Sequence, residues 1–192
     1  MIGTWTLVTP PAEEPVTLTE IKDHLHISST AEDSGLALYS QMGREAVEGE
    51  CWRALMPQTW DFHLPGWPAG GVIWIPRPPL RSITSITYRD EDGTAATFDA
   101  ANYRVDTATE PGRVVLAPGA DWPSVALDSS NPITVRFVAG YADAGDVPGM
   151  AKAAILLQIG EIYANREAAI TGTIVAVSPA VQRVLNLLRV RY

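Results

Sequence analysis

The sequence predicts an α+β protein in which helical segments near the two ends of the chain flank a β-rich middle. Apolar residues recur at helical spacing before residue 57 and again after Pro148. Between them, residues 58–141 contain short alternating or β-branched runs separated by Gly, Pro and Asp turns. We therefore expect a helical bundle built from the N- and C-terminal segments, with an inserted small antiparallel β-sandwich or open barrel.

Four segments follow from this pattern. Residues 1–16 contain three prolines and little periodicity, so we expect an extended arm. Residues 17–57 hold the N-terminal helices, residues 58–141 the β-rich insertion domain, and residues 142–192 the C-terminal helices that complete the bundle. With 192 residues, the chain is long enough to bury a real core as one large domain or two small lobes.

A capping box predicts where the first helix begins. Thr17 and Glu20 have the spacing at which each side chain accepts a hydrogen bond from the other residue's amide, and the helix is expected to end near residue 27. Residues 28–30 form a turn and supply the cap of a second helix, over about residues 31–51. We expect its inward face to contain Leu36, Tyr39, Met42, Ala46 and Val47.

The β-rich middle is organised around two strand signals joined by prolines. Residues 72–75 are a β-branched and aromatic run, which predicts a strand buried on both faces. The prolines of residues 76–79 end it, because proline lacks a backbone donor. Residues 80–88 alternate as a second strand, and the Asp92-Gly93 turn predicts a hairpin with residues 94–98. Further strands are expected at 58–64, 103–105, 113–116 and 133–141.

Helical patterns return after Pro148. Apolar residues from Ala151 to Ile162 form one face of a helix that is expected to end near Glu167, and residues 168–177 are expected to form a loop. Ser178-Pro179 combines an N-cap with a proline at the first helical position. The amphipathic helix that follows either folds back on the domain or reaches into a groove of a partner.

Composition excludes several classes of protein. The net charge of −8 divides into −6 for residues 1–60, −3 for residues 61–140 and +1 for residues 141–192. An acidic body argues against wrapping nucleic acid through phosphate contacts. No run approaches the length of a membrane span, and the N-terminus lacks a secretion signal. The single cysteine, Cys51, cannot form an internal disulfide, which favours a reducing compartment.

The sequence contains no recognisable catalytic or metal-binding pattern. His24 and His26 are two residues apart, so on a helix they face different ways and cannot share a metal. The acidic residues 90–92 resemble the start of a calcium loop but lack its distal glutamate, and a hairpin turn explains them. Cys51 has no histidine nearby in the sequence. We expect a protein that is not an enzyme and has no cofactor.

An ordered set of motifs resembles the head–tail connector (adaptor) proteins of long-tailed bacteriophages, prophages and gene transfer agents. The set comprises Leu18–Leu25, Arg53–Trp60, Ile75–Leu80 with Ser85–Tyr88, Val138–Tyr141 with Asp146–Pro148, and Tyr163–Glu167. It spans residues 16–189 in the family's order.

The resemblance implies a structural role in virion assembly. Such proteins form a ring, here expected to hold twelve subunits, that binds beneath the portal of a DNA-filled head and extends its exit channel. The implied partners are further copies of the chain, the portal, and a stopper or tail-terminator protein. DNA would pass through without sequence-specific binding, and no membrane is involved. The chain would assemble in the bacterial cytoplasm and reside in the neck of a virion or phage-like particle.

Two groups of contact residues are assigned on this basis. The terminal segment is expected to bind the portal through Val184, Leu185, Leu187, Leu188, Arg189, Val190, Arg191 and Tyr192. Ring contacts are expected from Leu36, Tyr39, Met42, Glu45, Arg53 and Arg166. The alternative function is a DNA-packaging factor similar to a small terminase subunit, which the acidic composition disfavours.

Overall fold

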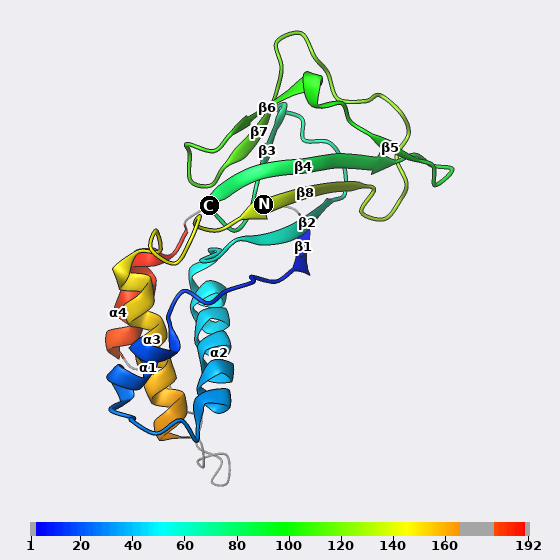
Figure 1. Ribbon diagram of the computed structural model, residues 1–192. Coiled ribbons are helices and arrows are strands. Elements are labelled where there is room, and N and C mark those ends of the chain that lie inside the picture. The colour runs from blue at the N-terminus through cyan, green and yellow to red at the C-terminus, as the bar shows by residue number, and fades with distance from the viewer. Residues whose placement is uncertain (1–2, 166–178, 191–192) are drawn as a thin grey trace. The chain divides into compact units, whose positions relative to one another are not determined.

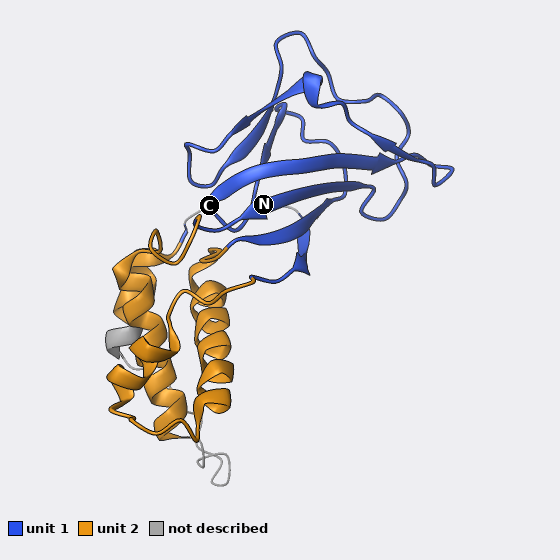
Figure 2. Cartoon of the chain, in the orientation of Figure 1, with its two compact units in different colours: residues 1–11, 57–141, 190–192 blue, residues 12–56, 142–189 orange. Residues whose placement is uncertain are grey.

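The computed structural model describes residues 3–165 and 179–190, and the chain divides into two compact units (Figure 1, Figure 2). The β unit consists of residues 1–11, 57–141 and 190–192, and the helical unit of residues 12–56 and 142–189. The α+β class predicted from the sequence is confirmed. The expected loop at residues 168–177 lies outside the described residues.

Two antiparallel sheets make up the described part of the β unit, and neither closes into a barrel (Figure 1). The five-stranded sheet has the order β1 (Thr4–Thr9), β2 (Gln58–Leu64), β8 (Ile133–Ala139), β4 (Leu80–Arg89) and β5 (Ala95–Thr97). The three-stranded sheet has the order β3 (Val72–Trp74), β7 (Arg113–Leu116) and β6 (Tyr103–Asp106), with a 3-10 turn (Ala100–Asn102) before β6. A sandwich arrangement of the two sheets stays a prediction.

The alternation that predicted β2 and β8 buries one face of the larger sheet. Trp60 is paired with Phe137 and Phe62 with Val135, and all four side chains are buried. Ile86 of β4, opposite Val135 on the other side of β8, is also fully buried. Because successive strand residues point to opposite faces, this period of two places every second side chain in the core.

Two expectations for the β unit need correction or addition. β3 is not buried on both faces: Ile73 is buried, but Trp74 is 44% exposed. The reason is that only one face of β3 is covered: Ile73 and its partner Val114 are buried on that face. Trp74 lies on the other face, where the Arg113 guanidinium is 5.3 Å from the centre of its ring. Residues 1–16, expected to be an arm, contain strand β1, which pairs antiparallel with β2. The prolines end β3 as predicted, and β4 belongs to the other sheet.

The helical unit contains α1 (Leu18–Leu25), α2 (Asp33–Cys51), α3 (Gly149–Ala164) and α4 (Pro179–Leu188). α2 packs against α3 and α4, and α1 packs against α2 and α3 (Figure 1). Gly43 permits a close approach of α2 and α3, because a Cβ at this position would lie 3.0 Å from Ile159 and 3.3 Å from Ile155. Both isoleucines are fully buried, so this contact lies in the core of the unit.

The predicted capping box is present at α1. The Thr17 amide donates to Glu20 Oε2 at 2.6 Å, and the Glu20 amide donates to Thr17 Oγ1 at 3.2 Å. The hydrogen bond from the Thr17 backbone is the main reason that the pKa of Glu20 is lowered. The cap expected at residues 28–30 is wrong, since α2 begins at Asp33 after Glu32, which makes no side-chain capping bond.

The inward face of α2 also differs from the prediction. Met42 and Ala46 are exposed, and Tyr39 is only partly buried. The buried residues are Leu36, Ser40, Gly43, Arg44, Val47, Glu48 and Cys51. The physical reason is that Arg44 and Glu48 pair with each other in the core, so the charged side of the helix faces inward.

Candidate assembly surfaces

The described residues offer no chemical centre. They contain no cluster of three or more His, Cys, Asp or Glu residues suited to a metal, and no helix long and apolar enough to span a bilayer. The acidic segment at residues 90–93 is a hairpin turn, in which Asp90 Oδ1 accepts hydrogen bonds from the amides of Asp92 and Thr94 at 3.1 and 2.8 Å. Cys51 is buried, and burial raises the pKa of its thiol to about 11.

The end of α4 is fastened to the end of α2 by a group of contacts that we call the C-terminal clamp (Glu50, Arg53, Leu188 and Arg189). Arg53 Nε donates to the Leu188 carbonyl at 2.6 Å, which satisfies an acceptor that the end of a helix leaves free. Arg189 donates from Nε to the Glu50 carbonyl at 2.9 Å and from Nη2 to Glu50 Oε2 at 2.8 Å. Of the two alternatives left open by the sequence, the described part of the terminal helix folds back on its own unit.

The residues assigned to the portal contact fall into three environments. Leu185 is 2% exposed and belongs to the core of the helical unit. Leu187 is 73% exposed, Arg189 is exposed, and Val184, Leu188 and Val190 are partly buried. Arg191 and Tyr192 lie outside the described residues. The apolar surface that this segment offers to a partner is therefore centred on Leu187.

The residues assigned to ring contacts are similarly divided. Leu36 is fully buried, and the Tyr39 ring meets the Tyr163 ring edge to face with centroids 6.5 Å apart. Met42, 42% exposed, and Glu45 lie on the surface. Arg53 belongs to the C-terminal clamp, and Arg166 lies outside the described residues.

Sequence reasoning missed an apolar stripe on the outside of α2. This stripe, which we call the α2 stripe, consists of Leu38, Met42, Ala46 and Gly49, all exposed. Their spacings of four, four and three residues place them on one side of the helix. The same periodicity in the sequence is the signal that could have revealed the stripe, but it was assigned to the inward face.

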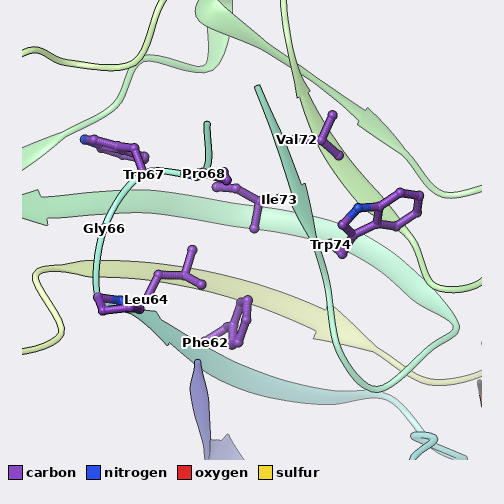
Figure 3. A pocket seen from close by; sticks show the side chains of 9 residues that line it. Phe62, Leu64, Gly66, Trp67, Pro68, Val72, Ile73 and Trp74 are labelled. Atoms are coloured by element: carbon purple, nitrogen blue, oxygen red, sulfur yellow. The ribbon is translucent and has the colours of Figure 1, made fainter. Parts of the chain in front are cut away.

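The β unit contains an apolar cleft of about 470 Å³ (Figure 3). Phe62 and Leu64 of β2 point toward Ile73 of β3 across it, and Trp67 and Trp74 contribute to its lining. Trp67 stacks on Trp122 at 4.8 Å, which holds the surrounding loops together. No lining residue is ionisable, so the cleft can bury apolar groups but cannot perform acid–base chemistry.

The helical unit carries an excess of negative charge, unlike a protein surface that binds nucleic acid. Its segments carry thirteen Asp and Glu residues against seven Lys and Arg residues, and those of the β unit carry nine against seven. Binding to a phosphate backbone requires an excess of cationic side chains. Neither unit has the charge expected of the alternative function, a DNA-packaging factor.

Comparison with known proteins identifies the fold. No protein-family model matches the chain, and no curated protein matches it. A chain from the virion of a native gene transfer agent (GTA) particle has a TM-score of 0.79 and 22% identity, covering 98% of this chain and 96% of that chain. A chain from the neck of an empty GTA particle, computed with C6 symmetry, has a TM-score of 0.78 and 23% identity, covering 98% and 96%.

A third chain, from the neck of a native GTA particle computed with C12 symmetry, has a TM-score of 0.74 and 21% identity and covers 100% of this chain and 97% of that chain. The shared fold therefore includes both the helical and the β unit. At the level of the fold, the comparison agrees with the resemblance to proteins of gene transfer agent particles that the sequence motifs indicated.

Proposed function

We propose that this chain is a structural head–tail adaptor that forms a ring in the neck of a phage-like particle. The observation that carries the proposal is the correspondence of fold over 98% of this chain and 96% of a chain from a GTA neck. The match extends over nearly the whole of both chains, so it includes both the helical and the β unit. The function is therefore assigned to the whole chain rather than to one module.

In this role the ring lies beneath the portal, extends the DNA exit channel, and provides a platform for a stopper or tail-terminator protein. Necks with the same fold have been computed with C6 and C12 symmetry, which supports a ring of twelve copies. The net charge of −8 suits a conduit, because a like-charged wall discourages DNA from sticking while it passes. The helical unit forms the bundle of the ring, and the β unit is an added domain.

The terminal segment, residues 184–192, contacts the portal. The exposed side chain of Leu187 supplies its apolar anchor, and Arg189 supplies a cation beside it. The C-terminal clamp fixes the orientation of both residues on the helical unit. Pre-organisation of this kind reduces the entropy that is lost on binding.

Immunogold electron microscopy tests the assignment. An epitope inserted at Gly119, an exposed residue with open space around its Cα, should leave the fold intact. The label is expected at the junction of head and tail in particles made by the producing host. Label over the capsid or along the tail, with the junction unlabelled, would overturn the proposal.

A further inference from the structure

A second exposed apolar stripe lies on α3. It consists of Met150, Ala153, Leu157 and Ala164, which we call the α3 stripe. Met150 is 44% and Leu157 37% exposed, although both are large apolar residues. Their spacings of three, four and seven residues keep them on one side of the helix. The two longest described helices of this unit thus each present an apolar stripe to solvent, and one acid borders each stripe, Glu45 on α2 and Glu161 on α3.

The two stripes lie on different sides of the helical unit. α2 and α3 contact each other at Gly43, which faces Ile155 and Ile159, and no stripe residue takes part in this contact. The buried residues of α2 lie on the side of the helix opposite the α2 stripe, and those of α3 likewise lie away from the α3 stripe. Among the described residues, no other helix covers either stripe.

The stripes are similar in length and in composition. At 1.5 Å per residue, the α2 stripe spans about 17 Å and the α3 stripe about 21 Å. Each combines two large side chains with two small residues: Leu38 and Met42 with Ala46 and Gly49, and Met150 and Leu157 with Ala153 and Ala164. A Cβ added at Gly49 would meet nothing within 4 Å, so a side chain from another molecule has room there. The small residues of each stripe let the two helices approach closely, so that large side chains of one stripe can contact both the large and the small residues of the other.

We propose that the α2 stripe of one copy packs against the α3 stripe of the next copy, and that this helix-to-helix contact closes the ring. The inference rests on the proposed function and names the surfaces that it uses. Two unlike surfaces on different sides of a subunit are what a cyclic, head-to-tail assembly requires, whereas one self-complementary surface gives a twofold dimer. The C6 and C12 symmetry of necks with this fold favours the first arrangement and makes a second copy the occupant of each stripe.

Disulfide cross-linking in assembled particles tests the pairing. The full chain carries Met42→Cys together with Leu157→Cys on a Cys51→Ala background, and particles are oxidised mildly before non-reducing electrophoresis. The expected result is a ladder of covalent oligomers that reductant removes. A mixture of the two single variants should give dimers but no ladder. The matched control, Ala37→Cys with Leu157→Cys, changes an exposed α2 residue outside the stripe and should give no ladder.

Each negative result of the cross-linking experiment overturns a different part of the proposal. Dimers from Met42→Cys alone would show that two α2 stripes meet across a twofold axis, which overturns the pairing. A second cysteine pair, Leu38→Cys with Ala153→Cys, is tested in the same way. If the chain is present in the neck and neither cysteine pair cross-links, the pairing is overturned but the adaptor role is not. Absence of the wild-type chain from particles overturns the adaptor role itself.

A second experiment exchanges charges across the proposed contact. It does not require a disulfide to form or the cysteine variants to enter particles. Met42→Lys and Leu157→Glu should each prevent incorporation into particles, because each places a charge in an apolar contact. Both changes in one chain should restore incorporation, since every interface then pairs lysine with glutamate. Full incorporation of both single variants contradicts the proposal, and so does a double variant that stays excluded.

Discussion

Arg44 Nη1 donates a 2.8 Å hydrogen bond to Glu48 Oε2, and both side chains are 5% exposed in the helical unit. Glu48 Oε1 also accepts the Leu55 amide at 2.7 Å, and Arg44 Nε donates to Glu14 Oε2 at 2.8 Å. Burial acts to lower the pKa of Arg44, but the carboxylates of Glu14 and Glu48 outweigh it, and the pKa is raised. The network joins α2 to the segments before α1 and after α2.

Glu48→Gln should destabilise the helical unit by roughly 2 kcal/mol, because buried Arg44 loses one of its two close carboxylates and keeps only that of Glu14. Urea unfolding of the full chain measures the loss. Glu45→Gln is the control, since Glu45 is exposed and lies 3.6 Å from Arg44, and it should change the free energy of unfolding by less than about 0.5 kcal/mol. Equal effects of the two substitutions would contradict the importance of the buried pair.

The cross-strand pair of Asp61 and Arg136 predicts a dependence of stability on pH. Arg136 donates from Nε and Nη2 to the two carboxylate oxygens of Asp61 at 2.8 and 2.7 Å, and these bonds lower the pKa of Asp61. A group whose pKa is lower in the folded state stabilises above its unfolded pKa, about 3.9, and this stabilisation is lost as pH falls through the folded value.

Asp61→Asn should therefore cost about 0.5–1 kcal/mol at neutral pH, a modest amount because the Arg136 side chain is 45% exposed. The difference between wild type and variant should shrink as pH falls below the unfolded pKa of about 3.9, and it should vanish once pH lies below the lowered pKa of folded Asp61. Denaturant unfolding of both proteins at several pH values measures it. A difference that persists unchanged into acid would show that the ion pair is not its source.

Cys51 should be unreactive in the folded protein. Its thiol is buried, with Sγ 3.5 Å from the Leu185 carbonyl, and burial raises its pKa to about 11. Because the thiolate is the nucleophile, a disulfide reagent at about pH 8 should modify it only after denaturant is added. Rapid modification without denaturant would mean that α4 leaves α2 readily, and would weaken the case for a fixed terminal helix.

Leu187→Asp should abolish attachment to the portal without changing stability by more than about 0.5 kcal/mol, because Leu187 is 73% exposed. Co-purification with portal, together with thermal unfolding, measures the two effects. Val105→Asp, an exposed apolar site in the β unit, is the matched control and should retain the portal. Deleting all of α4 is a poorer test, since it also removes buried Leu185 and the C-terminal clamp. Normal portal binding by Leu187→Asp would remove this residue from the contact.

Local sequence signals accounted for most of the secondary structure. The alternation of residues 58–64 and 133–139 and the Thr17/Glu20 capping box appear in the structure as expected. β1 was not expected as a strand, because its order depends on pairing with β2, which lies fifty or more residues further along the chain. The expectation that Trp74 is buried is wrong because an apolar run does not reveal that only one face of its strand is covered by the rest of the protein.

The assembly surfaces were less predictable because α2 is apolar on two sides. Leu36 and Val47 belong to the buried side, and Leu38 and Met42 to the exposed one. The choice between them depends on Glu14 and Leu55, which bind the Arg44–Glu48 pair from other parts of the chain. Helical periodicity contains no information about such partners, so it could indicate that α2 is amphipathic but not which side faces solvent.

Electron microscopy of particles from a producing host that lacks this chain tests the adaptor role most directly. The account predicts DNA-filled heads and free tails that are not joined, with joining restored when the wild-type chain is supplied in trans. Heads and tails that join normally in its absence would contradict the account.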